Sequence, residues 1–188
     1  MSEKGTVYFF TGLAGAGKTT VGGLFYLRLK AQNPDAVLLD GDQLRNAGIP
    51  AAASSANMPA QDDSRYTTEA RKAGAWGLFA HCRALAEQGH DVVCCSISMY
   101  KEIRDWNRAN IENYREIYIK VTYETLYRRD QKKLYSSGAK NVVGIDLPWD
   151  EPEHSDVVMR NDGQEAPEEI VDRLVEFFGL EQEARHDL

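Results

Sequence analysis

The segment from Gly12 to Thr19 reads GLAGAGKT and constrains the fold more than any other part of the chain. It fits the pattern G-x-x-x-x-G-K-[ST], which requires a strand before it and a helix after it. Thr6–Thr11, TVYFFT, has the β-branched and aromatic composition of a buried strand, and Lys18–Lys30 spaces its apolar residues as a helix does. The sequence therefore predicts a strand, a phosphate-binding loop and a helix.

The residue types of this loop indicate what it binds. Glycines let the backbone N–H groups point at phosphate oxygens, with the positive end of the following helix behind them. We expect Lys18 to bridge the β- and γ-phosphates of ATP and Thr19 to place its hydroxyl on a magnesium ion. A glycine-rich turn that matches by chance is the alternative, and the flanking strand and helix disfavour it. The expected nucleotide-binding residues are Gly12, Ala14, Gly15, Ala16, Gly17, Lys18, Thr19 and Thr20.

Strands and helices alternate along the rest of the chain. Further strands are predicted at Ala36–Leu39, Asp91–Ile97, Glu116–Val121 and Val157–Met159. Helices are predicted at Ser64–Gln88, Lys101–Asn113, Thr125–Lys133 and Glu168–Phe178, and Ala51–Asp63 has the composition of a surface loop. This order predicts an α/β fold, a parallel sheet with helices on both faces.

Length and charge limit the remaining choices. A chain of 188 residues predicts one domain, which we place at residues 1–180, with a frayed tail at 181–188. The net charge of −7 disfavours binding to nucleic acid or to an anionic membrane. The three cysteines include no C-x-x-C pair, so the sequence supports neither a zinc site nor a disulfide framework, and we expect the protein in the reducing cytoplasm. The apolar run Val7–Phe10 is too short for a signal peptide or a membrane span.

The class of phosphate-loop protein follows from motifs elsewhere. Neither Asp-x-x-Gly nor Asn-Lys-x-Asp occurs, which disfavours a regulatory GTPase, and the absence of an LSGGQ-like segment disfavours a transporter ATPase. A small kinase remains. Asp40, Asp42 and Arg45 follow the second strand, where parallel sheets hold ligands. An aspartate there could bind magnesium through water or accept a proton from a hydroxyl, and Arg45 could hold an anionic acceptor; the alternative is an Asp-Gly turn with a surface arginine.

Taken together, the motifs resemble the adenylylsulfate kinase family of P-loop kinases, which transfer the γ-phosphate of ATP to the 3′-hydroxyl of adenosine 5′-phosphosulfate. LDGDQLR at Leu39–Arg45 resembles the family's LDGDxxR, and ISMYK at Ile97–Lys101 is similar to ISPYR. RDQKKLY at Arg129–Tyr135 resembles RDPKGLY, and GIDLPWDEPEHSD at Gly144–Asp156 resembles GIDDPYEAPENPD. With the phosphate loop, the likeness extends from residue 6 to about residue 163 in the family's order.

The resemblance implies a role for each matching residue. It places Lys18, Asp40, Asp42 and Arg129 in catalysis, Thr19 and Asp42 on magnesium, and the acceptor on Arg45, Arg65, Ile97, Ser98 and Lys132. Which aspartate acts as the base stays open. It also implies a short lid that begins at the basic residues Arg128 to Lys133, a homodimer, and a place in sulfate assimilation. The alternatives are a solvated helix end for the basic residues and a buried hydroxyl bonded to backbone for Ser98.

The acceptor side departs from the family pattern. Val142–Ile145, VVGI, replaces FTGI, and no phenylalanine lies between Phe25 and Phe79, so both rings that hold adenine in the family are missing. Stacking is worth about 1 to 3 kcal/mol per base. Trp76, Tyr100 and Trp149 are candidate replacements. Adenylylsulfate kinase activity is the first expectation; the alternatives are a kinase of another nucleotide acceptor, such as cytidine diphosphoramidate, and a nucleotide-binding regulator without catalysis.

Overall fold

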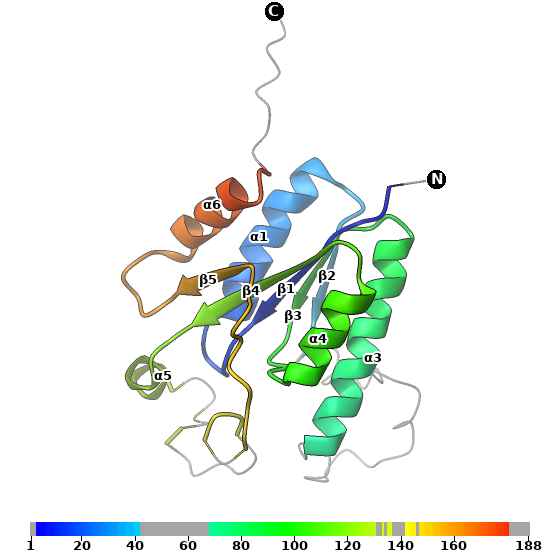
Figure 1. The fold of residues 1–188 in the computed structure, drawn as a ribbon. Coiled ribbons are helices and arrows are strands. Elements are labelled where there is room, and N and C mark those ends of the chain that lie inside the picture. Colours follow the sequence, from blue (N-terminus) through cyan, green and yellow to red (C-terminus); the bar gives the residue numbers. More distant parts are fainter. Residues whose placement is uncertain are drawn as a thin grey trace, which may run out of the picture.

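The computed structural model describes residues 3–41, 68–130, 133, 135–136, 142–145 and 147–180. Within these residues the chain forms a five-stranded parallel sheet in the order β2-β3-β1-β4-β5 (Figure 1). The strands are β1 (Val7–Thr11), β2 (Val37–Asp40), β3 (Val92–Cys95), β4 (Tyr114–Lys120) and β5 (Val157–Arg160). The predicted α/β architecture is confirmed.

The first strand of the chain is the central strand of the sheet. Val7 lies opposite Val92 of β3 on one side and opposite Tyr114 of β4 on the other. Because every strand runs in the same direction, the carboxyl ends meet at one edge of the sheet. That edge receives the loop after β1 and the residues after β2, β3 and β5.

Helices cover both faces of the sheet (Figure 1). The helices α1 (Lys18–Gln32) and α6 (Pro167–Phe177) pack on one face, and α3 (Thr68–Glu87) and α4 (Lys101–Asn110) pack on the other. The short helix α5 (Tyr123–Arg129) follows β4.

The sequence of β1 fits this sandwich of helices. Successive side chains of a strand point to opposite faces, so Tyr8 and Phe10 join the cluster with Phe25 of α1, whereas Phe9 joins the cluster with Phe79 of α3. A strand buried on both faces needs an unbroken apolar run, and this is why TVYFFT lacks polar alternation.

Each predicted strand and helix is present among the described residues, with most of its ends shifted by a few residues. The first four residues of the helix predicted at Ser64–Gln88 lie outside the described residues. The helix predicted to reach Lys133 ends at Arg129, because Asp130 turns into the left-handed region (φ 35°) while its N–H still donates to Leu126 O. The predicted loop at 51–63 and the predicted tail at 181–188 lie outside the described residues. None of the helices that the structure describes is long and apolar enough to cross a membrane.

Candidate functional site

The loop between β1 and α1 uses backbone conformations and close contacts that require glycine. Gly17 has φ +96°, and a Cβ placed there would lie 2.5 Å from Asn161 Nδ2. A Cβ at Gly12 would lie 2.5 Å from the carbonyl oxygen of Ile119 on β4. The two glycines of the motif therefore allow the loop to close against the neighbouring strand and against the residue after β5.

The carbonyl oxygens of the loop face side chains from later parts of the chain. The carbonyl oxygen of Ala14 accepts from Tyr135 Oη (2.6 Å), that of Gly15 accepts from Arg129 Nη1 (3.5 Å), and that of Ala16 accepts from Asn161 Nδ2 (2.8 Å). Every described peptide is trans, so the N–H of each of these peptides points away from its carbonyl. The N–H of Ala16 donates to the carbonyl oxygen of Leu13 at 3.1 Å, whereas the N–H groups of Gly15 and Gly17 turn to the side opposite their bonded carbonyls, where phosphate oxygens can accept them.

The first turn of α1 brings together the cation and the hydroxyl that the motif predicts. Lys18 Nζ lies folded over the loop and donates to the carbonyl oxygen of Leu13 at 2.9 Å. Thr19 and Thr20 are exposed beside it, and the turn contains no acidic residue. The helix end therefore keeps its positive character toward an incoming anion.

Asp40, at the end of β2, lies beside this turn although β3 separates β2 from β1. Its Oδ2 accepts a hydrogen bond of 2.7 Å from Thr19 Oγ1, and the residue is 6% exposed. Mg²⁺ in nucleotide sites binds a few protein oxygens and keeps several waters, so one hydroxyl and one carboxylate with phosphate oxygens fit it. Among the described residues no group of three or more His, Cys, Asp or Glu could hold a metal ion alone.

Arg129 aims from the end of α5 at the phosphate loop. Its Nη2 donates to the carbonyl oxygen of Asn161 at 2.7 Å, and the neighbouring Arg128 donates to that of Asp162 at 3.3 Å. The Asp162 carboxylate accepts from the N–H and hydroxyl of Thr122, and the Thr122 N–H holds the pKa of Asp162 below its usual value. The cationic end of α5 is thus fixed to the residues that follow β5.

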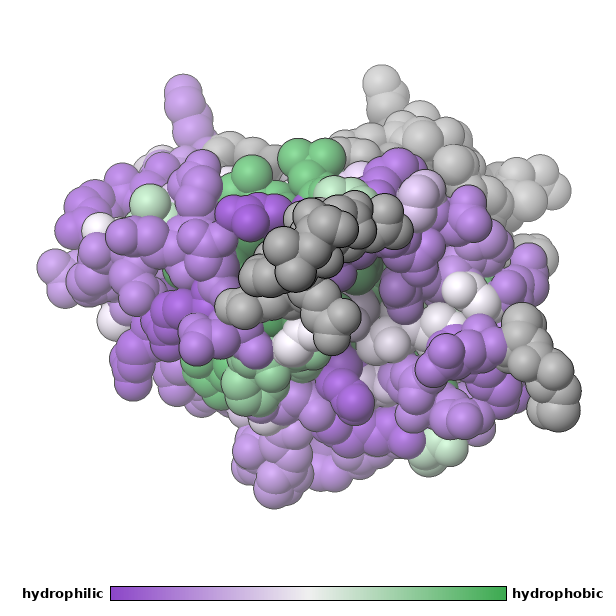
Figure 2. Space-filling view, turned by 90° about the horizontal axis from the view of Figure 1, so that it is seen from above, coloured by the Kyte–Doolittle hydropathy of each residue, from purple (hydrophilic) through white to green (hydrophobic). Residues whose placement is uncertain are grey.

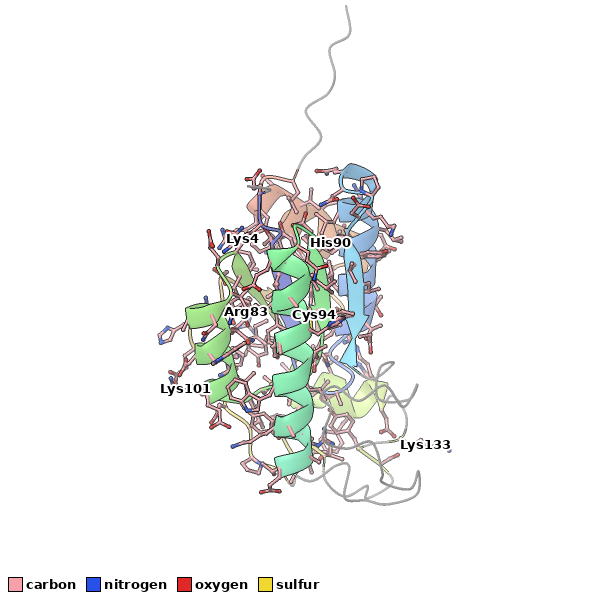
Figure 3. The ribbon with its side chains drawn as sticks, turned by 90° about the vertical axis from the view of Figure 1, so that its right-hand side faces the viewer. Lys4, Arg83, His90, Cys94, Lys101 and Lys133 are labelled. Atoms are coloured by element: carbon pink, nitrogen blue, oxygen red, sulfur yellow. The ribbon has the colours of Figure 1, made fainter. Side chains whose placement is uncertain are left out.

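The turn after α5 is held by its own carboxylate. Asp130 Oδ1 accepts hydrogen bonds from the N–H groups of Tyr135 (2.9 Å) and Ser136 (3.2 Å). Burial raises the pKa of Tyr135 to about 12, so its hydroxyl keeps the proton that it donates to the phosphate loop. Lys133 lies at the end of the molecule opposite Lys4 and His90 (Figure 3).

The residues after β3 form the described part of the predicted acceptor side. Thr11 Oγ1 donates to the carbonyl oxygen of Ile97 at 2.6 Å, which ties this segment to β1. Ser98 has φ +28°, a conformation that side-chain-bearing residues rarely adopt, and its hydroxyl lies 2.9 Å from that of Ser96. Such backbone strain occurs mainly at functional sites. The alternative predicted a buried hydroxyl bonded to backbone. Ser98 is buried, at 8% exposed, but its hydroxyl is bonded to the Ser96 side chain rather than to backbone.

The candidate replacement rings lie in three different surroundings. Trp76 packs edge-on against Trp106, with ring centroids 5.5 Å apart, as part of the core. Tyr100 is 8% exposed. Trp149 is half-buried and packs on the cluster that contains Leu13 and Met99, next to the phosphate loop. Among these three, Trp149 combines partial exposure with contact to the site.

Four of the predicted residues, Asp42, Arg45, Arg65 and Lys132, lie outside the described residues. Sequence reasoning assigned no role to Asn161 or Tyr135, which contact the loop directly. A signal for Asn161 was available, since it follows the last predicted strand at the edge where parallel sheets hold ligands.

Comparison with known proteins agrees with this geometry. The family model described as adenylylsulphate kinase matches residues 4–160. The chain is 35% identical to the cytidine diphosphoramidate kinase of Campylobacter jejuni, over 96% of this chain and 100% of that protein. It is 33% identical to the adenylyl-sulfate kinase of Picosynechococcus, over 90% of this chain and 92% of that protein.

A solved structure shares the fold. The APS kinase CysC of Mycobacterium tuberculosis, in complex with AMPPNP and APS, superposes with a TM-score of 0.76. The match covers 94% of this chain and 98% of that one, at 24% identity.

Proposed function

The chain belongs to the adenylylsulphate kinase family, whose members are ATP-dependent kinases that use Mg²⁺, and from this premise we propose that it phosphorylates a hydroxyl of a nucleotide acceptor. The observation that carries the proposal is that Lys18 and Arg129 both contact the phosphate loop, at the carbonyl oxygens of Leu13 and Gly15, next to Thr19 in the first turn of α1. Positioning and charge neutralisation supply most of the catalysis in phosphoryl transfer.

The proposed chemistry is an in-line displacement. The acceptor oxygen forms a bond to the γ-phosphorus, the bond from that phosphorus to the β–γ bridging oxygen breaks, and ADP leaves. Lys18 moves from the Leu13 carbonyl to the β- and γ-phosphates, and Arg129 adds positive charge where the transferring group lies. Mg²⁺, when bound beside Thr19, neutralises phosphate charge.

The proton of the acceptor hydroxyl needs a base. Asp40 already accepts the hydrogen bond from Thr19, so we assign Asp40 to positioning that hydroxyl and a magnesium-bound water. Asp42, two residues later in the sequence, is then the proposed proton acceptor.

For the acceptor we propose cytidine diphosphoramidate. The relative of that name matches over its full length, and the segment that carries a ring in the family carries buried valines here. Val142 and Val143 are each 5% exposed, and Val143 packs on Leu13 and Met99, so neither offers a stacking plane for a purine. Adenosine 5′-phosphosulfate is the second candidate, favoured by the match of the family model over residues 4–160.

Release of ADP from Mg²⁺-ATP tests the proposal. ADP release by the wild type is measured in the presence of cytidine diphosphoramidate, in the presence of adenosine 5′-phosphosulfate and without an acceptor. Lys18→Ala serves as the blank. We expect cytidine diphosphoramidate to stimulate release most, and Lys18→Ala to lower kcat by about a hundredfold or more. Stimulation by adenosine 5′-phosphosulfate alone would reverse the order of the candidates. Stimulation by neither, in a protein that binds ATP, would overturn both.

A further inference from the structure

A buried ion cluster lies between α4 and β4, away from the phosphate loop. Glu116 of β4 is 1% exposed and Arg104 of α4 is 6% exposed. Arg104 Nε lies 3.7 Å from Glu116 Oε1, and Arg108 Nη2 lies 3.5 Å from Oε2. Tyr114 Oη also donates to Oε2, at 3.2 Å. The proposed chemistry uses none of these residues, and charged side chains are rarely buried this deeply unless they are paired.

The cluster holds the segment 150–156, which we call the strap. Ser155 Oγ donates to Glu116 Oε1 at 3.0 Å, and the N–H of Glu116 donates to Asp156 Oδ2 at 2.7 Å. Arg108 binds Asp156 Oδ2 at 3.3 Å and also donates to the carbonyl oxygen of His154. Two guanidinium groups and two carboxylates thus balance each other around one end of the strap.

The other end of the strap is tied just as closely. Asp150 Oδ2 accepts from the N–H of Lys101, and the N–H of Asp150 donates to the carbonyl oxygen of Met99, both at 2.9 Å. Glu151 Oε1 accepts from Tyr118 Oη at 3.1 Å. The strap is therefore bonded to the residue that follows Ser98 and to β4.

The strap continues directly from the described residues of 142–149, which we call the cover segment. A Cβ at Gly144 of this segment would lie 2.7 Å from Leu13 Cδ2 in the phosphate loop, and the Gly144 carbonyl oxygen accepts from Tyr123 Oη at 3.0 Å. Val143 packs against Leu13 and Met99 in one cluster. The cover segment therefore bridges the ATP side and the acceptor side, and the strap fixes where it ends.

We propose that Arg104 and Glu116 are positioning residues for the acceptor: through the strap they fix the cover segment against Leu13 and Met99, without touching either substrate. Arg104 also contacts the strap directly, because its Nη2 donates to the carbonyl oxygen of Glu151 at 3.5 Å. Only the kinetic test of this positioning role rests on the proposed kinase function.

The test compares Glu116→Gln with Glu112→Gln, which changes an exposed glutamate just before β4 that pairs with Lys4. Glu116→Gln keeps the shape but leaves the guanidinium groups without their buried counter-charge. We expect amide exchange in residues 142–156 to rise by about tenfold or more. We also expect KM for the acceptor to rise by about fivefold or more, with KM for ATP within about twofold of wild type. Glu112→Gln should change none of these quantities.

If Glu116→Gln does not fold, Ser155→Ala replaces it, because this change removes one donor from the strap and leaves every charge in place. The same split between the two KM values is expected, at about two- to tenfold for the acceptor. Unchanged exchange in 142–156, or an equal rise in both KM values, overturns the positioning role. Exchange needs no acceptor, so an inactive wild type would overturn the proposed function and leave this result readable.

Discussion

Asn161 contacts the phosphate loop, β4 and α5 through different atoms. Its Nδ2 donates to Ala16 O at 2.8 Å, its carbonyl oxygen accepts from Arg129 at 2.7 Å, and its N–H donates to Lys120 O at 3.0 Å. The side chain is buried, so no water can take the place of these partners. One residue, through its side-chain amide and its backbone, therefore links the loop, β4 and α5.

Asn161→Asp tests this role. The substitution replaces a donor by a carboxylate oxygen beside Ala16 O, leaves that carbonyl without its bond, and places negative charge near the bound phosphates. Loss of a buried hydrogen bond costs about 1 to 3 kcal/mol, so we expect KM for ATP to rise by roughly 5- to 100-fold. Initial rates at varied ATP measure it. Asn110→Asp, on the exposed end of α4, is the control, and equal effects of the two changes would contradict the role.

Asp130 makes the turn after α5 sensitive to acid. The Ser136 hydroxyl and the Tyr135 N–H lower the pKa of Asp130 below its ordinary value of 3.8. A carboxylate with a lowered pKa in the folded state stabilises that state above its unfolded pKa, and the stabilisation disappears as pH falls through the folded value. We expect Asp130→Asn to lower the free energy of unfolding at pH 6 and to have no effect well below pH 3.8. Urea titrations measure this, with Asp35→Asn as control; an equal difference at both pH values would contradict it.

The residues that could be predicted are those within one continuous motif. Gly12 to Thr19 carry their geometry locally, because a strand, a turn and a helix start follow from adjacent residues. The contact of Asp40 with Thr19 could be predicted only as proximity at the sheet edge. For Asn161 the sequence offered only its place after the last strand, because its contact with the phosphate loop arises when β5 pairs with β4.

At the scale of the elements, α1 approaches the sheet closely at Gly22. A Cβ there would lie 2.4 Å from Cys95 Sγ and 3.3 Å from the Phe10 ring, whereas a Cβ at Gly23 would meet nothing within 4 Å. The two glycines are neighbours in one helix, so they share helix propensity and differ in packing.

Gly22→Ala and Gly23→Ala separate these effects. We expect Gly22→Ala to lower the free energy of unfolding by about 1 to 3 kcal/mol through overpacking. Gly23→Ala should raise it by about 0.5 to 1 kcal/mol, because alanine favours the helix. Denaturant melts of both variants and the wild type measure the differences. A stabilised Gly22→Ala would mean that α1 can move away from the sheet freely.

The strands and helices could be predicted well from the sequence, but the order of the strands in the sheet could not. Apolar runs and helical spacing gave each strand and helix because these patterns are local. The insertion of β3 between β1 and β2 depends on pairing between distant segments, such as Val37 with Val92, which periodicity does not encode. The end of α5 shifted because the backbone of one residue, Asp130, turns into the left-handed region, which periodicity does not encode.

At the scale of the whole molecule, the surface at the top of Figure 1 is mainly hydrophilic, with apolar areas between (Figure 2). A reducing compartment and a homodimer stay predictions from the sequence.

The three cysteines are all buried in the described structure, and Cys94 lies behind α3 (Figure 3). Burial, with the negative charge of Asp40, raises the pKa of Cys95 to about 12.

These thiols should therefore be inert in the folded protein. At pH 8 we expect no reaction with Ellman's reagent in the native state, and reaction of all three cysteines after unfolding in guanidinium chloride. A rapid reaction of one thiol in protein that still binds ATP would contradict the burial.

The central position of β1 has a consequence for synthesis on the ribosome. This strand is made before its partners β3 and β4, which end at Cys95 and Lys120, so the nascent chain carries an apolar segment long before it can pair on both sides. Pairing between distant segments is slow, and exposed apolar strands aggregate. We expect the phosphate loop to acquire its shape late, after β4 has been made, and chaperones that bind extended apolar peptides to meet Val7–Thr11 before any nucleotide does.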